Sequence, residues 1–284
     1  MENTDYLDVP IDEVLKSYKT FLSVKYPPHL VELKKREVSN SDGVKLEAAM
    51  FSVARHYRLT PKISEIIGEG GVDFLCSSDK YKFLLEVTHL DSASIEEKSG
   101  MANKLSTEGR AISMITNLLR SKASNKATQL SGHLVPRVLC IGASHIGSPI
   151  FMGKEAAEWL MTSDTKISVS IGKPNAEPKL ITGLEKSVFF RFDSKGKIEP
   201  CRQSISAILL VILDANSCLI KGLLHPAPAI PFDISLFPDI HFLKVANWPC
   251  SEGQIITEWI IHCPPTKRVY LDRIEFETEE LKSL

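Results

Sequence analysis

The chain has 284 residues, of which 43% are hydrophobic and 24% charged, and its formal net charge at pH 7 is -1. This composition is ordinary for a globular protein with a hydrophobic core, and the length allows one large domain or two small ones. The near-neutral charge excludes a global field that attracts polyanions, so any contact with nucleic acid must come from a local patch.

Targeting and membrane signals are weak along the chain. The N-terminal residues 1–14 are acidic and lack the basic and apolar regions of a secretory signal peptide. The longest apolar run, 205–213, is too short to span a bilayer as a helix. The six cysteines are scattered without a CxxC pair, so a zinc ribbon is not expected. We therefore expect a cytoplasmic protein with reduced thiols and no membrane partner.

The first third of the chain shows helical patterns followed by a hairpin. A helical pattern over 11–33 is broken at Pro27-Pro28, and residues 39–43 predict a turn. The amphipathic pattern over 45–59 predicts a helix that ends at Pro61 and a cluster of glycines. The next segment, GVDFLCSSDKYKFLLEVTHL (71–90), is typical of two strands joined by a polar turn.

The middle of the chain continues this alternation. A polar connection over 91–104 leads to a long helical pattern over 106–130, which ends near Gly132 and Pro136. The short apolar run 137–141 predicts a buried strand. The order helix, two strands, helix, strand predicts a mixed sheet flanked by helices.

Beyond Gly142 the patterns are weaker. The expected elements are a helix over 153–160, a strand over 188–192, a short helix over 204–208 that enters a strand over 209–213, and a strand over 218–224 that pairs with it across a turn. Ser204 and Ser206 resemble N-cap residues of the short helix expected over 204–208. The proline-rich stretch 225–249 predicts loops. Edge strands are expected over 258–263 and 268–277.

Two carboxylates stand in the predicted hairpin. Strand parity puts Glu86 and Thr88 on one face, and Leu85 and Val87 on the other. Carboxylates that emerge from an apolar hairpin are costly to bury without a positive partner, and a metal ion is a common one. The hairpin therefore suggests a metal site on a sheet.

Asp73 supplies the second carboxylate. Its neighbours Val72 and Phe74 are expected to point opposite to it. The alternative interpretation is a strand-edge carboxylate that accepts backbone hydrogen bonds near a glycine-rich turn.

Two helices add charged residues. Glu47 lies on the stripe of the 45–59 helix that should face the core, so it is either partnered there or functional. At about 100° per residue, Lys122, Lys126 and Gln129 share the apolar stripe of the helix that follows Glu86. Such lysines either extend to solvent or reach carboxylates on the sheet.

Taken in order, these residues resemble the PD-(D/E)XK nuclease superfamily over residues 47–141. Glu47 matches the acidic residue of its first core helix, Val72-Asp73 stands where the family has Pro-Asp, and Glu86 matches the (D/E) position. Thr88 stands where the catalytic lysine usually is. Some branches of the family place that lysine on the following helix.

The resemblance therefore implies that Lys126, in Lys126-Ala-Thr-Gln129, carries the lysine role, with Gln129 as a supporting polar contact. Lys122 and Lys104 are its competitors. Thr88 is a departure from the family pattern, because its hydroxyl cannot act as a cation.

The resemblance also implies a fold and an activity. The fold is α/β, with a restriction-endonuclease-like core and N-terminal helices in 1–142. The resemblance does not cover the second half of the chain, and we expect 143–284 to be an extension that completes or packs on the same domain. The function is a Mg²⁺-dependent nuclease, with Mn²⁺ as a substitute, that hydrolyses DNA in bacterial defence or DNA processing. Asp73, Glu86, the Val87 carbonyl and Glu47 would be the metal ligands. A homodimer or a protein partner is compatible with this reading.

The alternative is a binding or scaffolding module that keeps the nuclease fold and has lost catalysis. The missing lysine at position 88 and the near-neutral charge motivate it.

Overall fold

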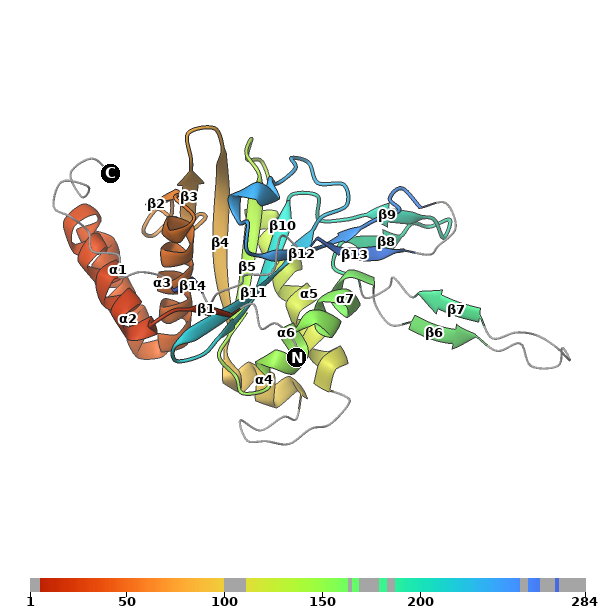
Figure 1. Cartoon of the computed structure of the whole chain (residues 1–284), viewed down its shortest axis with the longest axis horizontal. Helices are drawn as coiled ribbons and strands as arrows, with labels where there is room; N and C mark the ends of the chain where they lie inside the picture. The colour runs from red at the N-terminus through yellow and green to blue at the C-terminus, as the bar shows by residue number, and fades with distance from the viewer. Residues whose placement is uncertain are drawn as a thin grey trace, which may run out of the picture.

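Within the described residues, ten strands form one mixed sheet, and helices cover both of its faces (Figure 1). The computed structural model describes residues 6–99, 111–162, 165–168, 179–182, 187–250, 255–260 and 269–270. The main path of the sheet is β13-β12-β11-β10-β5-β4-β3-β2, with β1 and β14 attached beside β11. The expected α/β class, a large mixed sheet flanked by helices, is confirmed.

The strands of this sheet are β1 (Tyr6–Asp8), β2 (Thr60–Ile63), β3 (Phe74–Ser77), β4 (Lys82–Leu90), β5 (Arg137–Ala143), β10 (Ala207–Leu213), β11 (Ser217–Leu224), β12 (His241–Val245), β13 (Thr257–Ile260) and β14 (Val269–Tyr270). Two small hairpins lie outside it: β6 (Thr165–Ser168) with β7 (Lys179–Thr182), and β8 (Phe190–Phe192) with β9 (Ile198–Pro200).

The helices are α1 (Ile11–Lys25), α2 (Pro27–Ser39), α3 (Ser41–His56), α4 (Ser92–Ser99), α5 (Ala111–Gln129), α6 (Ser148–Met152) and α7 (Lys154–Thr162), with a 3-10 turn at Ile234–Leu236. No helix in the described part of the chain is long and apolar enough to cross a membrane.

The centre of the sheet is built from its most apolar strands. β4, β5 and β10 run parallel, with Leu85 opposite Val138 and Val138 opposite Ala207. Every residue of β5 and β10 is buried, because helices pack on both faces. This is why their sequences are near-continuous apolar runs instead of alternating patterns.

Two hydrophobic clusters fill the spaces on either side. One contains residues of α1, α2 and α3, and the other contains residues of α4, α5, α6 and α7. Figure 1 shows α1–α3 on one side of the sheet and α5–α7 on the other. Along β10, Leu209 and Val211 join the first cluster, whereas Leu210 and Ile212 join the second. The site described below forms where helices from both layers reach the β3–β4 hairpin.

The helix boundaries follow local signals. The helical pattern over 11–33 is indeed broken before Pro27, and the predicted 45–59 helix corresponds to α3. The side chain of Asn40 caps α3 by accepting a hydrogen bond from Gly43 N–H at 3.0 Å. In place of the turn expected over 39–43, only Asn40 separates α2 from α3. The expected helix over 153–160 is α7.

Three expectations about irregular segments are wrong. The polar connection after Leu90 contains α4, which begins where Asp91 accepts from Ser94 N–H at 2.8 Å. Residues 204–208 form no helix: the hydroxyl of Ser204 donates to the carbonyl of Ala127, and that of Ser206 to the carbonyl of Ile230. Tertiary hydrogen bonds, not helix caps, use both hydroxyls.

The third error is the stretch 225–249, which contains β12, a strand parallel to β11. The expected pairing of 209–213 with 218–224 is confirmed as the β10–β11 hairpin. The segment after α3 also adds β2, where Pro61 is tolerated because β2 is the edge strand of the sheet path.

Other expectations are met in part or fall outside the described residues. The strand expected over 188–192 is the shorter β8, and the edge strand expected over 258–263 is seen as β13. The helix expected over 106–130 is described from Ala111, and the strand expected over 268–277 is described as β14 only. Lys104 and residues 261–263 lie outside the described chain.

Candidate functional site

Asp73 and Glu86 meet at the start of the β3–β4 hairpin. Glu86 lies in the middle of β4 and is 2% exposed, and Asp73 comes directly before β3. Phe74 is opposite Leu85 in the antiparallel register, which brings Asp73 beside Glu86. The carboxylate oxygen Oδ2 of Asp73 accepts a hydrogen bond from Val87 N–H at 2.6 Å. The edge-carboxylate interpretation of Asp73 is therefore correct about its backbone bond, and the two carboxylates are neighbours as well.

The parity expected of β4 is seen in its packing. Leu85 and Val87 contact the cluster under α1–α3, whereas Leu84 and Leu90, which share the parity of Glu86, belong to the cluster under α5–α7. The parity expected around Asp73 is wrong, because Val72 and Phe74 lie in different clusters. Strand β3 begins only at Phe74, so the alternation does not extend back to Val72.

Helix α5 brings two polar side chains to Glu86. The ammonium of Lys126 forms an ion pair with Oε1 of Glu86 and donates to Oε1 of Gln129 at 2.9 Å. Gln129 Nε2 lies 3.3 Å from Oε2 of Glu86 and also donates to the carbonyl of Gly71. The stripe that the sequence assigns to Lys126 and Gln129 therefore faces the sheet, and the two residues are joined to Glu86.

The electrostatics of this pair are unusual for carboxylates. Burial raises the pKa of Asp73 well above its ordinary value, and the negative charges of Glu86 and Glu47 raise it further, against the opposing Val87 hydrogen bond. Burial also raises the pKa of Glu86, although Lys126 and the Asp73 N–H act to lower it. Because burial and nearby negative charge exceed the compensation from Lys126 and the backbone donors, both carboxyl groups hold a proton more readily than a free carboxyl group does.

Glu47 lies close to this pair but is held by other partners. It is 7% exposed on α3, accepts a hydrogen bond from the hydroxyl of Tyr18 at 2.8 Å, and forms an ion pair with Arg36 at 2.8 Å. The structure therefore gives Glu47 two partners, and a functional part for Glu47 stays a prediction. Neither Tyr18 nor Arg36 was identified from the sequence. Tyr18 lies on the apolar stripe of α1, whereas no sequence signal marks Arg36.

A polar pocket of about 190 Å³ opens beside Glu47, between α3 and the end of β4. Thr88 and Val87 line it together with Lys122 of α5. Lys122 and Lys126, one turn apart on the same helix, thus serve different places: Lys126 contacts Glu86, and Lys122 borders the pocket that contains Glu47. Thr88 lines this pocket but, unlike a lysine, supplies no positive charge to it.

The site can be tested as a metal site by its donors. Within the described residues, no group of three or more His, Cys, Asp and Glu side chains is arranged to hold a metal ion. Asp73 and Glu86 are nevertheless two adjacent oxygen donors whose ionised forms are disfavoured by burial and by nearby negative charge. Mg²⁺ commonly takes one or two protein carboxylates and keeps several waters, so this donor pair fits it without a third carboxylate.

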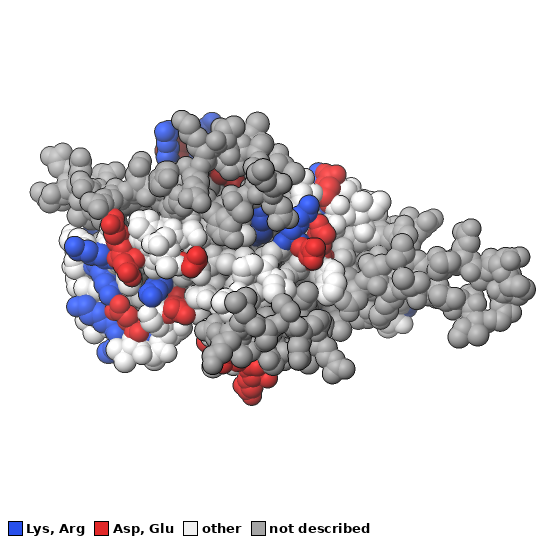
Figure 2. Space-filling model, turned by 60° about the horizontal axis from the view of Figure 1, so that its bottom comes forward, with Lys and Arg blue, Asp and Glu red and all other residues white. Residues whose placement is uncertain are grey.

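The surface carries charges of both signs. On the face shown in Figure 2, basic and acidic side chains of the described residues are interspersed and do not merge into one large patch. This agrees with the net charge of -1 and means that any polyanion must be recognised locally.

Comparisons with known proteins identify no relative. No family model, no curated protein and no solved structure matches the chain.

Proposed function

We propose that this chain is a metal-dependent nuclease that hydrolyses phosphodiester bonds in DNA on a restriction-endonuclease-like core. The observation that carries the proposal is the adjacent pair Asp73 and Glu86, to which α5 adds Lys126 and Gln129. Burial and nearby negative charge disfavour the ionised form of each carboxyl group, and a divalent cation would stabilise that form.

The order of elements supports the same proposal. Helix α3 carries Glu47, the antiparallel strands β2, β3 and β4 follow, and α5 then crosses to β5, which is parallel to β4. The resemblance to PD-(D/E)XK nucleases rests on residues in this order. Its acidic, metal-binding and lysine positions correspond to Glu47, Asp73, Glu86 and Lys126.

A Mg²⁺ ion would be held by Asp73, Glu86 and the Val87 carbonyl, where it would supply Lewis acidity toward a phosphate and lower the pKa of water. Lys126 lies next to Glu86, so it is placed to neutralise charge that builds on a phosphate or to position a water. Gln129 ties Lys126, Glu86 and the Gly71 carbonyl together and thereby fixes the direction of the lysine.

Glu47 has a supporting part in this proposal. Arg36 and Tyr18 hold its carboxylate, so its charge acts on Asp73 from a fixed position. The negative charge of Glu47 raises the pKa of Asp73 and so disfavours its ionised form, which a cation at the pair would stabilise. Direct coordination by Glu47 would require Arg36 to move.

A second candidate is a nuclease-fold binding module without catalysis. The observation that favours it is the engagement of Glu47 by Arg36 and Tyr18, together with Thr88 in place of the usual lysine. In that case the Lys126–Glu86 ion pair is structural, and it neutralises a buried carboxylate in place of a metal.

The experiment is a cleavage assay with linear and circular DNA, single- and double-stranded, in the presence of Mg²⁺ or Mn²⁺. The variants Asp73→Asn and Glu86→Gln keep the side-chain shape and remove the charge, and each should lower the cleavage rate by at least about 100-fold. Glu32→Gln, on the exposed side of α2, is the matched control and should cleave like the wild type.

Cleavage by both site variants at the wild-type rate would contradict the proposal. A wild-type protein that binds DNA but cleaves none of these substrates would favour the binding module.

A further inference from the structure

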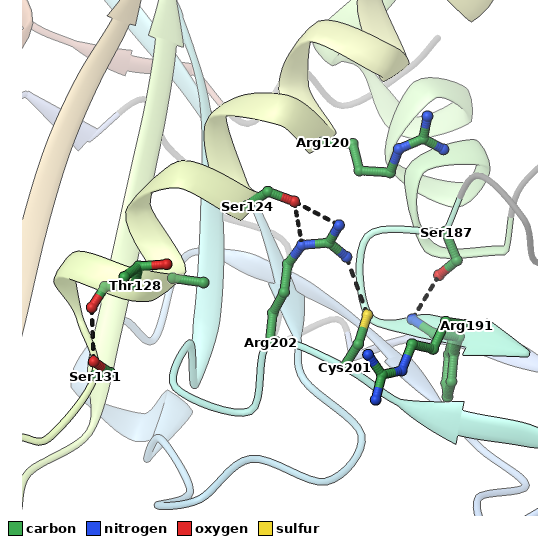
Figure 3. Close-up of a pocket in the computed structure, with 10 residues that line it drawn as sticks. Arg120, Ser124, Thr128, Ser131, Ser187, Arg191, Cys201 and Arg202 are labelled. Carbon is green, nitrogen blue, oxygen red and sulfur yellow. Dashed lines mark hydrogen bonds between the residues drawn. The ribbon is translucent and has the colours of Figure 1, made fainter. Parts of the chain in front are cut away.

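A second charged pocket lies on the opposite side of α5 from the carboxylates. Its cavity of about 570 Å³ is within the range of small-ligand sites, and three arginines, Arg120, Arg191 and Arg202, line it. No acidic residue lines it in the described part of the chain. Figure 3 shows the three arginine side chains, which come from α5, β8 and the segment after β9.

Helix geometry separates this pocket from the carboxylate site. Arg120, Ser124 and Thr128 follow one another at four-residue spacing, so they form one stripe of α5. At about 100° per residue, that stripe is turned by roughly 120–200° from Lys126. The two sites therefore use different faces of one helix.

Arg202 is fixed in place by neutral partners. Its Nε and Nη2 atoms donate to the hydroxyl oxygen of Ser124 at 2.8 and 2.6 Å, and Nη1 donates to the carbonyl of Val188 at 2.7 Å. The backbone of Arg202 has a φ of 58°, which is uncommon for a residue other than glycine. A rigid guanidinium in a strained segment is therefore presented to the pocket.

Arg120 is less satisfied. Its Nη2 donates to Asn117, but its Nη1 is buried without a hydrogen-bond partner among the described residues. Neither Arg120 nor Arg202 has an ion pair in the part of the chain that the structure describes, whereas Arg191 pairs with Glu199. Partial burial and the charge of Arg202 lower the pKa of Arg120, because two guanidiniums share the pocket without a counter-charge.

The chemistry of the pocket selects an anion with several acceptor oxygens. Guanidinium groups match phosphate oxygens with directed N–H donors, and two of them compensate more than one negative charge. Ser124 receives hydrogen bonds from Arg202 through its oxygen, so its O–H hydrogen is still available, and Thr128 adds a second hydroxyl. A tetrahedral phosphate accepts from donors in these different directions better than a planar carboxylate does.

We propose that the pocket lined by Arg120, Arg202 and Arg191 is a phosphate-binding site, separate from the carboxylate pair. The phosphate belongs either to a small phosphorylated compound or to the backbone of a nucleic-acid strand. The proposal stands whether or not the carboxylate site cleaves DNA.

The test is isothermal titration calorimetry with inorganic phosphate, without divalent cations and at low ionic strength. The wild type should bind phosphate, and Arg120→Gln should weaken the affinity at least tenfold, because a charged donor to the phosphate is lost. Lys35→Gln removes an exposed charge on α2 and should bind within about twofold of the wild type. Glu86→Gln should also bind like the wild type, which separates this inference from the fate of the nuclease proposal.

A thermal melt identifies a variant that fails to fold. Arg191→Gln then carries the test, because its side chain is 66% exposed and its loss should not disturb the core. It should also weaken phosphate binding. The proposal would be overturned if the wild type does not bind phosphate, or if Arg120→Gln and Arg191→Gln both bind phosphate with the affinity of the wild type.

Competition distinguishes the two sources of phosphate. A nucleoside monophosphate and a short single-stranded oligonucleotide are each titrated against bound phosphate. Displacement by the oligonucleotide at much lower concentration identifies a strand, and equal or better displacement by the monophosphate identifies a small compound.

Discussion

The two sides of helix α5 meet charged groups of opposite sign: carboxyl groups lie on one side and guanidiniums on the other. On the side of α5 that meets β4, Glu86 is paired with Lys126, and Asp73 has no ion pair among the described residues, whereas Glu47 on α3 is paired with Arg36. On the other face, Arg120 and Arg202 are held by neutral hydroxyl and carbonyl groups. The first face therefore contains a carboxyl group without a cationic partner, whereas Arg120 and Arg202 on the second have no anionic partner among the described residues.

Because of this difference, substitutions on the two sides of α5 should affect different properties of the protein. A buried carboxylate that loses its cation partner is costly, so changes on the acidic face should alter both chemistry and stability. Arg120 has a buried Nη1 without a partner among the described residues and Arg191 is largely exposed, so replacing either should alter ligand binding more than stability.

The largest expected effect separates the two lysines of α5. Lys126→Ala should lower DNA cleavage by about 100-fold or more, because the cation beside Glu86 is lost. Lys122→Ala removes the same charge one turn away and should lower cleavage by less than about tenfold. Rates are measured under single-turnover conditions with Mg²⁺. A larger loss in Lys122→Ala would move the catalytic lysine to the pocket beside Glu47.

A smaller effect tests how the acidic face is held together. Arg36→Ala leaves Glu47 buried with Tyr18 as its remaining partner, and it should lower the free energy of unfolding by about 1–3 kcal/mol. Lys19→Ala removes a partly exposed pair with Glu37 and should cost less than about 1 kcal/mol. Both are measured by urea denaturation. Equal losses would show that the Glu47 pair is an ordinary surface interaction.

The smallest effect is a pH dependence. The pKa of Asp73 is raised by burial and by Glu86, so the folded protein binds a proton that the unfolded chain releases above the ordinary value of 3.8. Its contribution to stability is therefore present at low pH and is lost as the pH rises through the folded-state pKa. Asp73→Asn removes this loss, so its stability relative to the wild type should increase from pH 4 toward pH 8.

The check is denaturation of both proteins at several pH values without divalent cations. A stability difference that stays constant with pH would show that Asp73 has the same proton affinity in the folded and unfolded states.

Part of this site was predictable because its signals are periodic and local. Strand alternation placed Glu86 on the face of β4 opposite to Leu85 and Val87, and the helical repeat placed Lys126 and Gln129 on the apolar stripe of the helix that the structure shows to meet Glu86. The apolar run 137–141 likewise indicated a buried strand, which is β5 in the structure. Such patterns record which face of an element is buried, and that information is contained within a few residues.

The rest depends on contacts between distant segments. Arg36 meets Glu47 only because α2 packs beside α3, and Arg202 meets Ser124 across 78 positions of sequence. The prediction around Val72 was wrong because strand alternation does not apply before Phe74, the first residue of β3. No local pattern predicts these features, since they follow from how the layers are stacked.

The central claim is that Asp73 and Glu86 hold a divalent cation. Isothermal titration of Mg²⁺, and of Mn²⁺ as its substitute, into the wild type measures this directly. We predict about one ion per chain at this site, with binding abolished in Glu86→Gln and Asp73→Asn and kept in Glu32→Gln. A wild type that binds neither ion, or site variants that bind as the wild type does, would contradict the claim.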